Sequence, residues 1–208
     1  DRQRNRDADL SGYDWVDRAT DLATREDVDV VVELIGGDEG IEHQDQMPDV
    51  PGPEDVSDRL DDLTPEQQWL LREWAHWDIR VLPDEKVAHR PGSASQQQVW
   101  FRYRETLPDD PIFHVCALAY MSDMTLLGSS KVPHPGANPQ VASLDHAMWF
   151  MRPFRADEWQ LYDQSSPSAC GGRSLTQGKI FNQYGEMVAA VMQEGLTRYT
   201  RDFTPQHG

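Results

Sequence analysis

The sequence is short of cysteine, of basic residues and of long apolar runs, and each shortage excludes a class of protein. Cys116 and Cys170 lie far apart without a Cys-x-x-Cys pair, so neither a disulfide framework nor a thiolate metal site is indicated. The 208 residues include only 19 Lys and Arg against 36 Asp and Glu, and the net charge of −17 argues against nucleic-acid binding. No apolar run is expected to span a membrane, and the charged first residues do not resemble a signal peptide.

Several catalytic and cofactor motifs are also missing. Ser165, Ser166 and Ser168 lie outside any Gly-x-Ser-x-Gly sequence, which disfavours serine-hydrolase chemistry. No spacing of His, Asp and Glu resembles a metal site, and the Gly-x-Gly-x-x-Gly loop of dinucleotide-binding domains is absent. We therefore expect a cytoplasmic protein with no metal, no cofactor and no nucleic-acid or membrane partner.

The negative charge is concentrated in the first part of the chain. Residues 1–90 contain 25 of the 36 acidic residues but only 10 of the 19 basic ones, whereas the remainder is nearly neutral. Residues 38–65 are acidic and rich in proline, a composition typical of a linker. This asymmetry predicts an acidic extension attached to a folded domain.

A few short elements are predicted before the folded domain. Residues 19–25 favour a helix, and the β-branched run 28–35 is typical of a buried parallel strand that ends at Gly36-Gly37. A second helix start is predicted at Thr64-Pro65, where an N-cap residue precedes a proline at the first helical position.

The second half of the chain predicts an α+β domain. Asp110-Pro111 is a helix start, and apolar residues at helical spacing predict a helix to about Leu127 that is apolar nearly all round and therefore buried. Two strands precede this helix and three follow, an order typical of a single hotdog domain, an antiparallel sheet wrapped around a central helix. Other α+β folds share this order. The predicted strands are 77–82, 97–103, 140–152, 159–181 and 187–199, the last two joined by a turn at 184–186.

Three motifs in this half resemble the type II acyl-CoA thioesterase family. The central motif is Ser143-Leu-Asp-His-Ala-Met-Trp-Phe-Met-Arg-Pro-Phe154, with Glu158-Trp159 close behind. The helix contributes Leu118-Ala-Tyr-Met-Ser-Asp123, and the ending contributes Gln183-Tyr-Gly-Glu-Met-Val-Ala-Ala and then Gln193-Glu-Gly-Leu-Thr-Arg198. The resemblance covers about 120 residues, and it implies a hotdog fold and the hydrolysis of fatty acyl-CoA.

The resemblance implies a catalytic trio of Asp123, Ser143 and Gln193. In the family, a carboxylate on the central helix, a hydroxyl on the next strand and a glutamine on the last strand hold the attacking water. A thioester is activated enough that an oriented, partly deprotonated water suffices without a covalent nucleophile. Ser143 keeps the hydroxyl of the threonine that the family often has, but it loses a methyl group that limits rotamers. Taken singly, each residue is more often structural than functional.

Other residues near these motifs have two readings each. His146 follows the hydroxyl strand and is either a neighbour of the site or a structural histidine, and His114 near the helix start is equally ambiguous. The apolar residues of the central motif are expected to line either the core or an acyl pocket. They are Met148, Trp149, Phe150 and Trp159.

The resemblance also implies that one domain is missing. The family usually carries two hotdogs in tandem, whereas here only one is expected, and residues 40–51 resemble the junction after a first hotdog. Residues 1–37 resemble instead an internal piece of the nucleotide-binding domain of homoserine dehydrogenases, without its phosphate loop. The predicted organisation is an extension at 1–39, a linker at 40–73, a hotdog domain at 74–200 and a tail at 201–208.

The predicted function is the hydrolysis of fatty acyl-CoA to a free fatty acid and CoA. The alternative is a non-catalytic acyl-CoA-binding or remnant hotdog module, and a hotdog hydratase or a nicotinamide dehydrogenase ranks lower for lack of the corresponding loops. Because the chain is acidic, the anionic phosphates of CoA require local Lys or Arg groups. A single hotdog is expected to pair with another copy, so the expected partners are acyl-CoA and a homo-oligomer.

Overall fold

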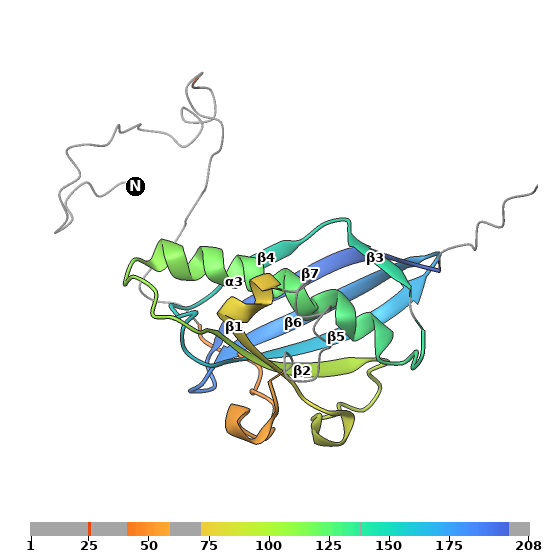
Figure 1. The fold of residues 1–208 in the computed structure, drawn as a ribbon, viewed down its shortest axis with the longest axis horizontal. Coiled ribbons are helices and arrows are strands. Elements are labelled where there is room, and N and C mark those ends of the chain that lie inside the picture. The colour runs from red at the N-terminus through yellow and green to blue at the C-terminus, as the bar shows by residue number, and fades with distance from the viewer. Residues whose placement is uncertain (1–24, 26–40, 59–71, 138, 200–208) are drawn as a thin grey trace, which may run out of the picture. The chain divides into compact units, whose positions relative to one another are not determined.

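The computed structural model describes residue 25 and residues 41–58, 72–137 and 139–199 (Figure 1). The chain divides into two compact units, residues 1–43 and 44–208, and the fold described below is that of the second unit. Apart from Arg25, the predicted elements at 19–25 and 28–35 lie outside the described residues, as do the dehydrogenase-like segment and the helix start at Thr64-Pro65. The domain boundaries given above stay predictions.

The described part of the second unit contains one antiparallel sheet of seven strands. The strand order is β1-β2-β5-β6-β7-β3, and β4 also pairs with β7, so that the long β7 is flanked by two short strands in succession. The strands are β1 (Trp77–Val81), β2 (Gln96–Tyr103), β3 (Gln140–Ser143), β4 (Ala147–Phe150), β5 (Gln160–Cys170), β6 (Arg173–Asn182) and β7 (Met187–Arg198).

Helix α3 (Pro111–Leu126) lies across one face of this sheet (Figure 1). It begins as the sequence predicts, because Asp110 accepts a hydrogen bond from the Ile112 N–H at 3.0 Å and Pro111 occupies the first turn. It continues into the 3₁₀ helix η5 (Leu127–Lys131). The other 3₁₀ helices are η1 (Pro53–Asp55), η3 (Arg72–His76) and η4 (Asp84–Lys86).

The expectation that this helix is buried all round is wrong. Ile112, Phe113 and Tyr120 are 67%, 49% and 50% exposed. The sheet covers only one side of the helix, and the apolar pattern by itself does not say whether the other side is covered by the same domain or by a partner.

The same helix requires a correction to the expectation that no run is long enough to cross a membrane. Residues Pro111–Lys131 are long and apolar enough to cross a membrane, because an 18-residue window in this range has a mean hydropathy of 1.2. However, 44% of that window is buried inside the domain. The core helix of a globular domain passes the same test, so the result is weak support for a membrane span.

Two of the predicted strands are each divided in the structure. The stretch 140–152 forms β3 and β4, separated by a β-bulge in which the Leu144 and Asp145 N–H groups both donate to the carbonyl oxygen of Glu194. The stretch 159–181 forms β5 and β6, which turn at Gly171 and Gly172 with φ values of 61° and 75°. Glycine accepts this left-handed backbone without steric cost, so the pair makes a hairpin turn that the strand pattern concealed.

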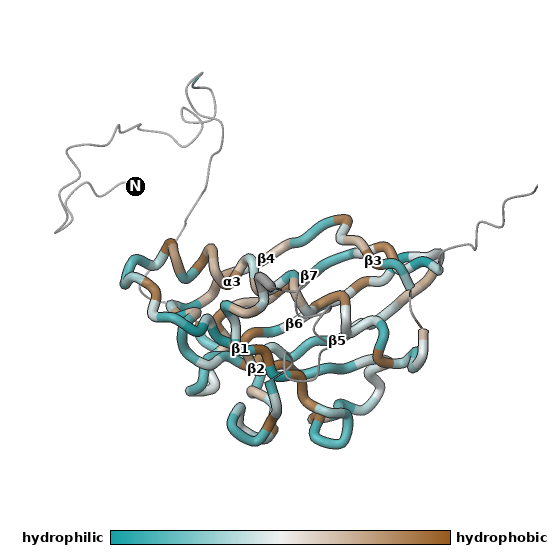
Figure 2. The backbone as a smooth tube through the Cα atoms, viewed as in Figure 1, coloured by the Kyte–Doolittle hydropathy of each residue, from teal (hydrophilic) through white to brown (hydrophobic). Residues whose placement is uncertain are grey.

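Two apolar clusters hold the domain together. The main cluster lies between α3 and the sheet, and in Figure 2 apolar segments recur along the helix and the strands beneath it. A smaller cluster lies on the opposite face, where residues 47–56 pack against Trp100 and the Trp100 Nε1–H donates to the Pro51 carbonyl oxygen at 2.8 Å. The main cluster consists of Trp77, Ile79, Val99, Phe101, Leu118, Met121, Leu126, Tyr162, Ile180, Val188, Ala189 and Val191.

Candidate active site

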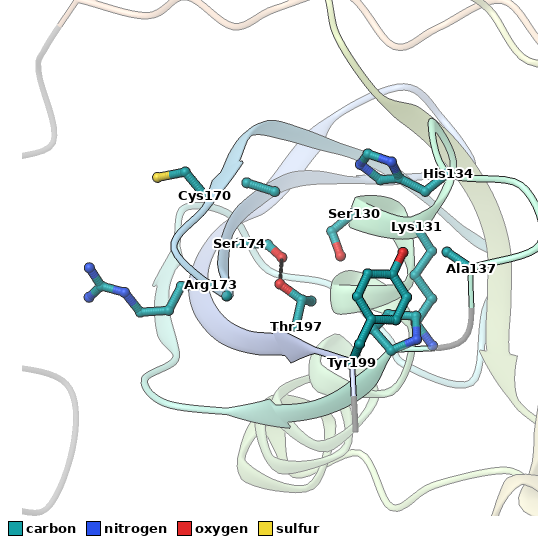
Figure 3. Close-up of a pocket in the computed structure, with 12 residues that line it drawn as sticks. Ser130, Lys131, His134, Ala137, Cys170, Arg173, Ser174, Thr197 and Tyr199 are labelled. Carbon is teal, nitrogen blue, oxygen red and sulfur yellow. Dashed lines mark hydrogen bonds between the residues drawn. The ribbon is translucent and has the colours of Figure 1, made fainter. Parts of the chain in front are cut away.

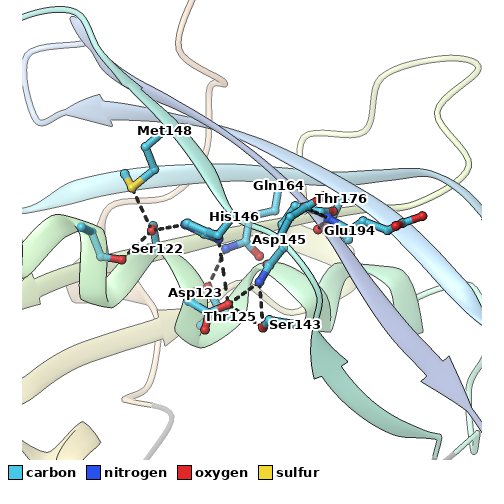
Figure 4. A network of polar contacts seen from close by, with 12 residues as sticks. Ser122, Asp123, Thr125, Ser143, Asp145, His146, Met148, Gln164, Thr176 and Glu194 are labelled. Atoms are coloured by element: carbon cyan, nitrogen blue, oxygen red, sulfur yellow. Dashed lines mark hydrogen bonds and ion pairs between the residues drawn. The ribbon is translucent and has the colours of Figure 1, made fainter. Parts of the chain in front are cut away.

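The three residues of the predicted trio meet between α3 and the edge of the sheet, and Asp123 and Ser143 are labelled in Figure 4. The side-chain amide of Gln193 on β7 donates to Asp123 Oδ1 and, at 2.9 Å, to Ser143 Oγ. The Ser143 hydroxyl at the end of β3 donates in turn to Asp123 Oδ1 at 3.1 Å. The three side chains therefore form a closed hydrogen-bonded triangle, although up to 70 positions separate them in the sequence.

The triangle is anchored in the protein and open on its carboxylate side. Gln193 is fully buried, whereas the side chain of Asp123 is 51% exposed. Both amide protons of Gln193 and the single hydroxyl proton of Ser143 are directed to this cluster, and the carboxylate accepts them at Oδ1. Among the described side chains none donates to Asp123 Oδ2, so this oxygen is available to a water or a substrate.

Two backbone features bring the trio together. Between the Ser143–Gly195 and Ala147–Met192 pairs, the segment that joins β3 to β4 has three residues (144–146), whereas β7 has two (193–194). This β-bulge ends β3 just after Ser143. Gly195 lies two residues beyond Gln193 on the same face of β7, and a Cβ atom there would approach Leu127 Cδ2 to 2.4 Å. The absent side chain therefore allows the end of the helix to approach β7 closely.

His146 and Ser122 lie beside the trio. His146 Nδ1 is 4.0 Å from Asp123 Oδ1, and its Nε2 is 2.7 Å from Ser122 Oγ, so the histidine borders the site (Figure 4). Sequence reasoning gave Ser122 no role, although its position directly before Asp123 was a possible signal. These contacts have the connectivity of a Ser-His-Asp triad, but Ser122 is fully buried and its hydroxyl donates to the Ala119 carbonyl oxygen at 2.8 Å. An acyl carbon has no approach to this hydroxyl, which argues against a nucleophilic serine.

The helix is fixed over the sheet by buried polar contacts near the trio. The Tyr162 hydroxyl donates to the Ser122 carbonyl oxygen at 3.2 Å, and the Gln164 amide donates to Thr125 Oγ1 at 2.5 Å. Burial, and after it the negative charge of Asp123, raises the pKa of Tyr162 well above its ordinary value. The phenol therefore stays a neutral donor that holds the helix in place.

The remaining sequence candidates divide between the core and the surface. His114 is buried and its Nδ1 accepts from the Ala156 N–H at 3.1 Å, which gives it a structural contact. Met148 is partly buried against the core and Ser122. Trp149 and Phe150 are 53% and 43% exposed, so of the two expected places the core is excluded for them, and a lining of an acyl pocket stays a prediction. Trp159 belongs to the cluster on the opposite face of the sheet, where two guanidinium groups lie 5.0 and 4.6 Å from its ring, so it does not line a pocket at the trio.

Comparison with known proteins agrees with this fold. The profile of the acyl-CoA thioesterase family matches residues 72–196. Acyl-CoA thioesterase 2 from Haemophilus influenzae is 33% identical over 182 residues, which cover 78% of this chain and 61% of that protein. The acyl-CoA thioesterase II TesB2 from Mycobacterium marinum is 61% identical with a TM-score of 0.70, over 79% of this chain and 60% of that one.

A more distant structure supports the fold alone. A conserved protein from Alicyclobacillus acidocaldarius, described as having a hotdog fold, is 18% identical with a TM-score of 0.56 over 78% of this chain and 59% of that one. This chain thus spans about 60% of the length of the two thioesterases named above. Because the family profile covers most of the chain and the sheet and helix have the hotdog arrangement, the chain belongs to the acyl-CoA thioesterase family.

Proposed function

We propose that this chain hydrolyses acyl-CoA thioesters to a fatty acid and CoA with a water molecule held by Asp123, Ser143 and Gln193. The observation that carries the proposal is the triangle itself, in which two neutral donors converge on one carboxylate oxygen while the rest of the carboxylate faces solvent. Such an arrangement orients a carboxylate as a general base and leaves its second oxygen for the reacting water.

The chemistry requires only proton transfer and attack by water. Asp123 Oδ2 accepts a proton as the water oxygen bonds to the thioester carbonyl carbon. The carbon–sulfur bond then breaks, and the proton held by Asp123 passes to the sulfur, so that CoA leaves as a free thiol. Gln193 and Ser143 keep the carboxylate in one orientation throughout, which reduces the entropy lost on reaching the transition state.

Thiol release from a medium-chain and a long-chain acyl-CoA tests this proposal. Asp123→Asn keeps the shape of the side chain but cannot accept the proton, and we expect turnover to fall by about a hundredfold or more. Asp84→Asn is the matched control, because Asp84 is 82% exposed on η4 and makes no contact with the trio. Equal rates for wild type and Asp123→Asn would contradict the role of the carboxylate.

The second candidate function is a non-catalytic acyl-CoA-binding module. It is favoured by the exposed apolar side of α3, where Ile112, Phe113 and Tyr120 are 67%, 49% and 50% exposed. Binding of acyl-CoA that slows its spontaneous hydrolysis, with no thiol release above the blank, would select this function over the first.

We also propose that the active form is a homo-oligomer in which a second copy covers the exposed side of α3. An exposed stripe on α3, here called the α3 stripe, leads along the helix towards Asp123 and consists of Ile112, Phe113, Cys116 and Tyr120. Its two aromatic members are about half exposed. A partner at this place would cover apolar surface next to the reacting carboxylate. Sedimentation at assay concentrations tests this, and a monomer with normal turnover would refute it.

A cytoplasmic location is proposed for the same activity. Cys116 and Cys170 are both free and exposed. Unpaired exposed thiols are typical of proteins in a reducing compartment, which supports this location.

A further inference from the structure

A cavity of about 180 Å³ lies at the end of the sheet, and Figure 3 shows the residues that line it. The end of η5, the loop that follows it, the turn between β5 and β6, and the end of β7 surround it. We propose that this cavity binds a phosphate group of the CoA moiety, with Lys131 as its principal cation. This inference rests on the proposed function for the identity of the ligand.

The charge around the cavity is opposite to that of the whole chain. The lining includes Lys131, His134 and Arg173 and, among the described residues, no carboxylate, although acidic residues outnumber basic ones 36 to 19 in the sequence. An anionic ligand repelled by most of this protein is therefore attracted here.

The basic residues differ in their availability. Arg173 lies on the rim with its guanidinium directed away from the cavity in Figure 3, and it forms an ion pair with Glu194 at 3.2 Å. Lys131 has no carboxylate partner within ion-pair distance in the part of the chain that the structure describes. Its ammonium group is thus the one best placed to neutralise a phosphate.

Hydroxyl groups complete the lining of the cavity. Ser130 and Ser174 are 5% and 1% exposed, and Ser174 Oγ lies 2.6 Å from Thr197 Oγ1. Tyr199 borders the opening and is 71% exposed. Ser130 already donates to the Leu127 carbonyl oxygen at 2.7 Å, so one proton of the Ser174–Thr197 pair remains to donate to a phosphate oxygen. A lysine beside this pair forms a polar lining that suits a phosphate better than an acyl chain.

The distance from the trio suits a CoA thioester. Thr197 follows Gln193 by four residues on the same face of β7, which corresponds to about 13 Å at the rise of a β-strand. Leu127 packs onto Gly195 between them, so a ligand cannot pass under the helix at this point. The pantetheine arm instead has an open route along β3, which is exposed over its whole length and pairs with this part of β7.

Equilibrium binding to the full chain separates this inference from the hydrolysis proposal. The probes are CoA, 3′-dephospho-CoA, pantetheine and inorganic phosphate, titrated by calorimetry against wild type, Lys131→Gln and the control Lys86→Gln. Both variants replace one lysine by glutamine and therefore lose the same charge. Lys86 lies on η4 and does not line the cavity, so only Lys131→Gln removes a charge from the cavity. Thermal melting of each variant shows whether it is folded.

We expect Lys131→Gln to weaken CoA binding by about tenfold, the effect of one lost charged hydrogen bond, and to leave pantetheine binding unchanged. Lys86→Gln should bind CoA like wild type. A larger loss for CoA than for 3′-dephospho-CoA would place the 3′-phosphate in the cavity, and an equal loss would place the diphosphate there. CoA binding unaffected by Lys131→Gln overturns the inference, as does an effect seen only with inorganic phosphate. If Lys131→Gln weakens CoA binding but the wild-type chain releases no thiol from acyl-CoA, the cavity stays assigned to CoA and the hydrolase proposal is refuted.

Discussion

Replacement of Gly195 by alanine is expected to disturb the trio from a position outside it. Gly195 faces the helix, and an added Cβ atom would lie 2.4 Å from Leu127 Cδ2, 2.8 Å from Cδ1 and 3.1 Å from Cγ. Leu127 is 8% exposed, so its side chain has little room to turn aside. The end of the helix must therefore move away from β7, and Asp123 lies one turn before this contact.

Gly195→Ala is expected to lower both the free energy of unfolding and the turnover. Overpacking by one carbon in a filled core costs about 1–3 kcal/mol of the free energy of unfolding. A shift of about 1 Å between Asp123 and Gln193 is enough to reduce turnover by roughly a hundredfold. Turnover should therefore fall further than stability alone predicts, because most molecules stay folded while the triangle is broken.

The assay combines urea unfolding with thiol release from acyl-CoA. Gly128→Ala is the matched control, since its Cβ atom would meet nothing closer than Gln97 Nε2 at 3.9 Å. We expect this control to be neutral or stabilised by up to about 1 kcal/mol. Leu127→Ala combined with Gly195→Ala should be less damaging than the sum of the single changes, because the two positions share one contact. Gly195→Ala with the stability and turnover of wild type would refute the reasoning.

Two further predictions concern the serine beside the trio and the acid sensitivity of the domain. Ser122→Ala should keep turnover within about tenfold of wild type, the effect of one lost hydrogen bond, whereas loss of a nucleophilic serine would cost about a millionfold in thiol release. Burial by itself would raise the pKa of Asp157, but hydrogen bonds from Arg155 and from the Leu107 N–H outweigh it and lower that pKa below the ordinary 3.8. Its stabilising contribution is therefore present above pH 3.8 and is lost as the pH falls through the lower folded value. Urea unfolding of wild type and Asp157→Asn should differ near neutral pH and converge in strong acid, and a constant difference would contradict the assignment.

Local signals in the sequence predicted most of the fold correctly. The helix start at Asp110-Pro111 depends on a cap and a proline whose preferences are local, and the structure confirms it. The strands β1, β2 and β7 are also close to their predicted bounds. The reason is that alternating apolar and polar residues indicate a strand with one face buried. The division at Gly171-Gly172 was missed because strand-like residues continue on both sides of the turn.

The trio shows what a sequence can and cannot say about a site. Family motifs singled out Asp123, Ser143 and Gln193, but nothing in the spacing of these residues required them to be neighbours. Their contacts depend on the bulge between β3 and β4 and on the close approach of Leu127 to Gly195. Both features arise from long-range pairing with β7, which local propensities do not encode.

The sequence alone determined most of the elements of this protein, the family to which it belongs and the candidate site residues, because caps, alternation and motifs are properties of short segments. The tertiary structure decided which apolar residues are covered, which polar groups meet and where basic residues gather. Phe113 and Leu118 are equally apolar in the sequence, yet Phe113 is half exposed and Leu118 is fully buried. The reason is that burial depends on which face of α3 the sheet covers, and that is settled only when distant strands pair and pack.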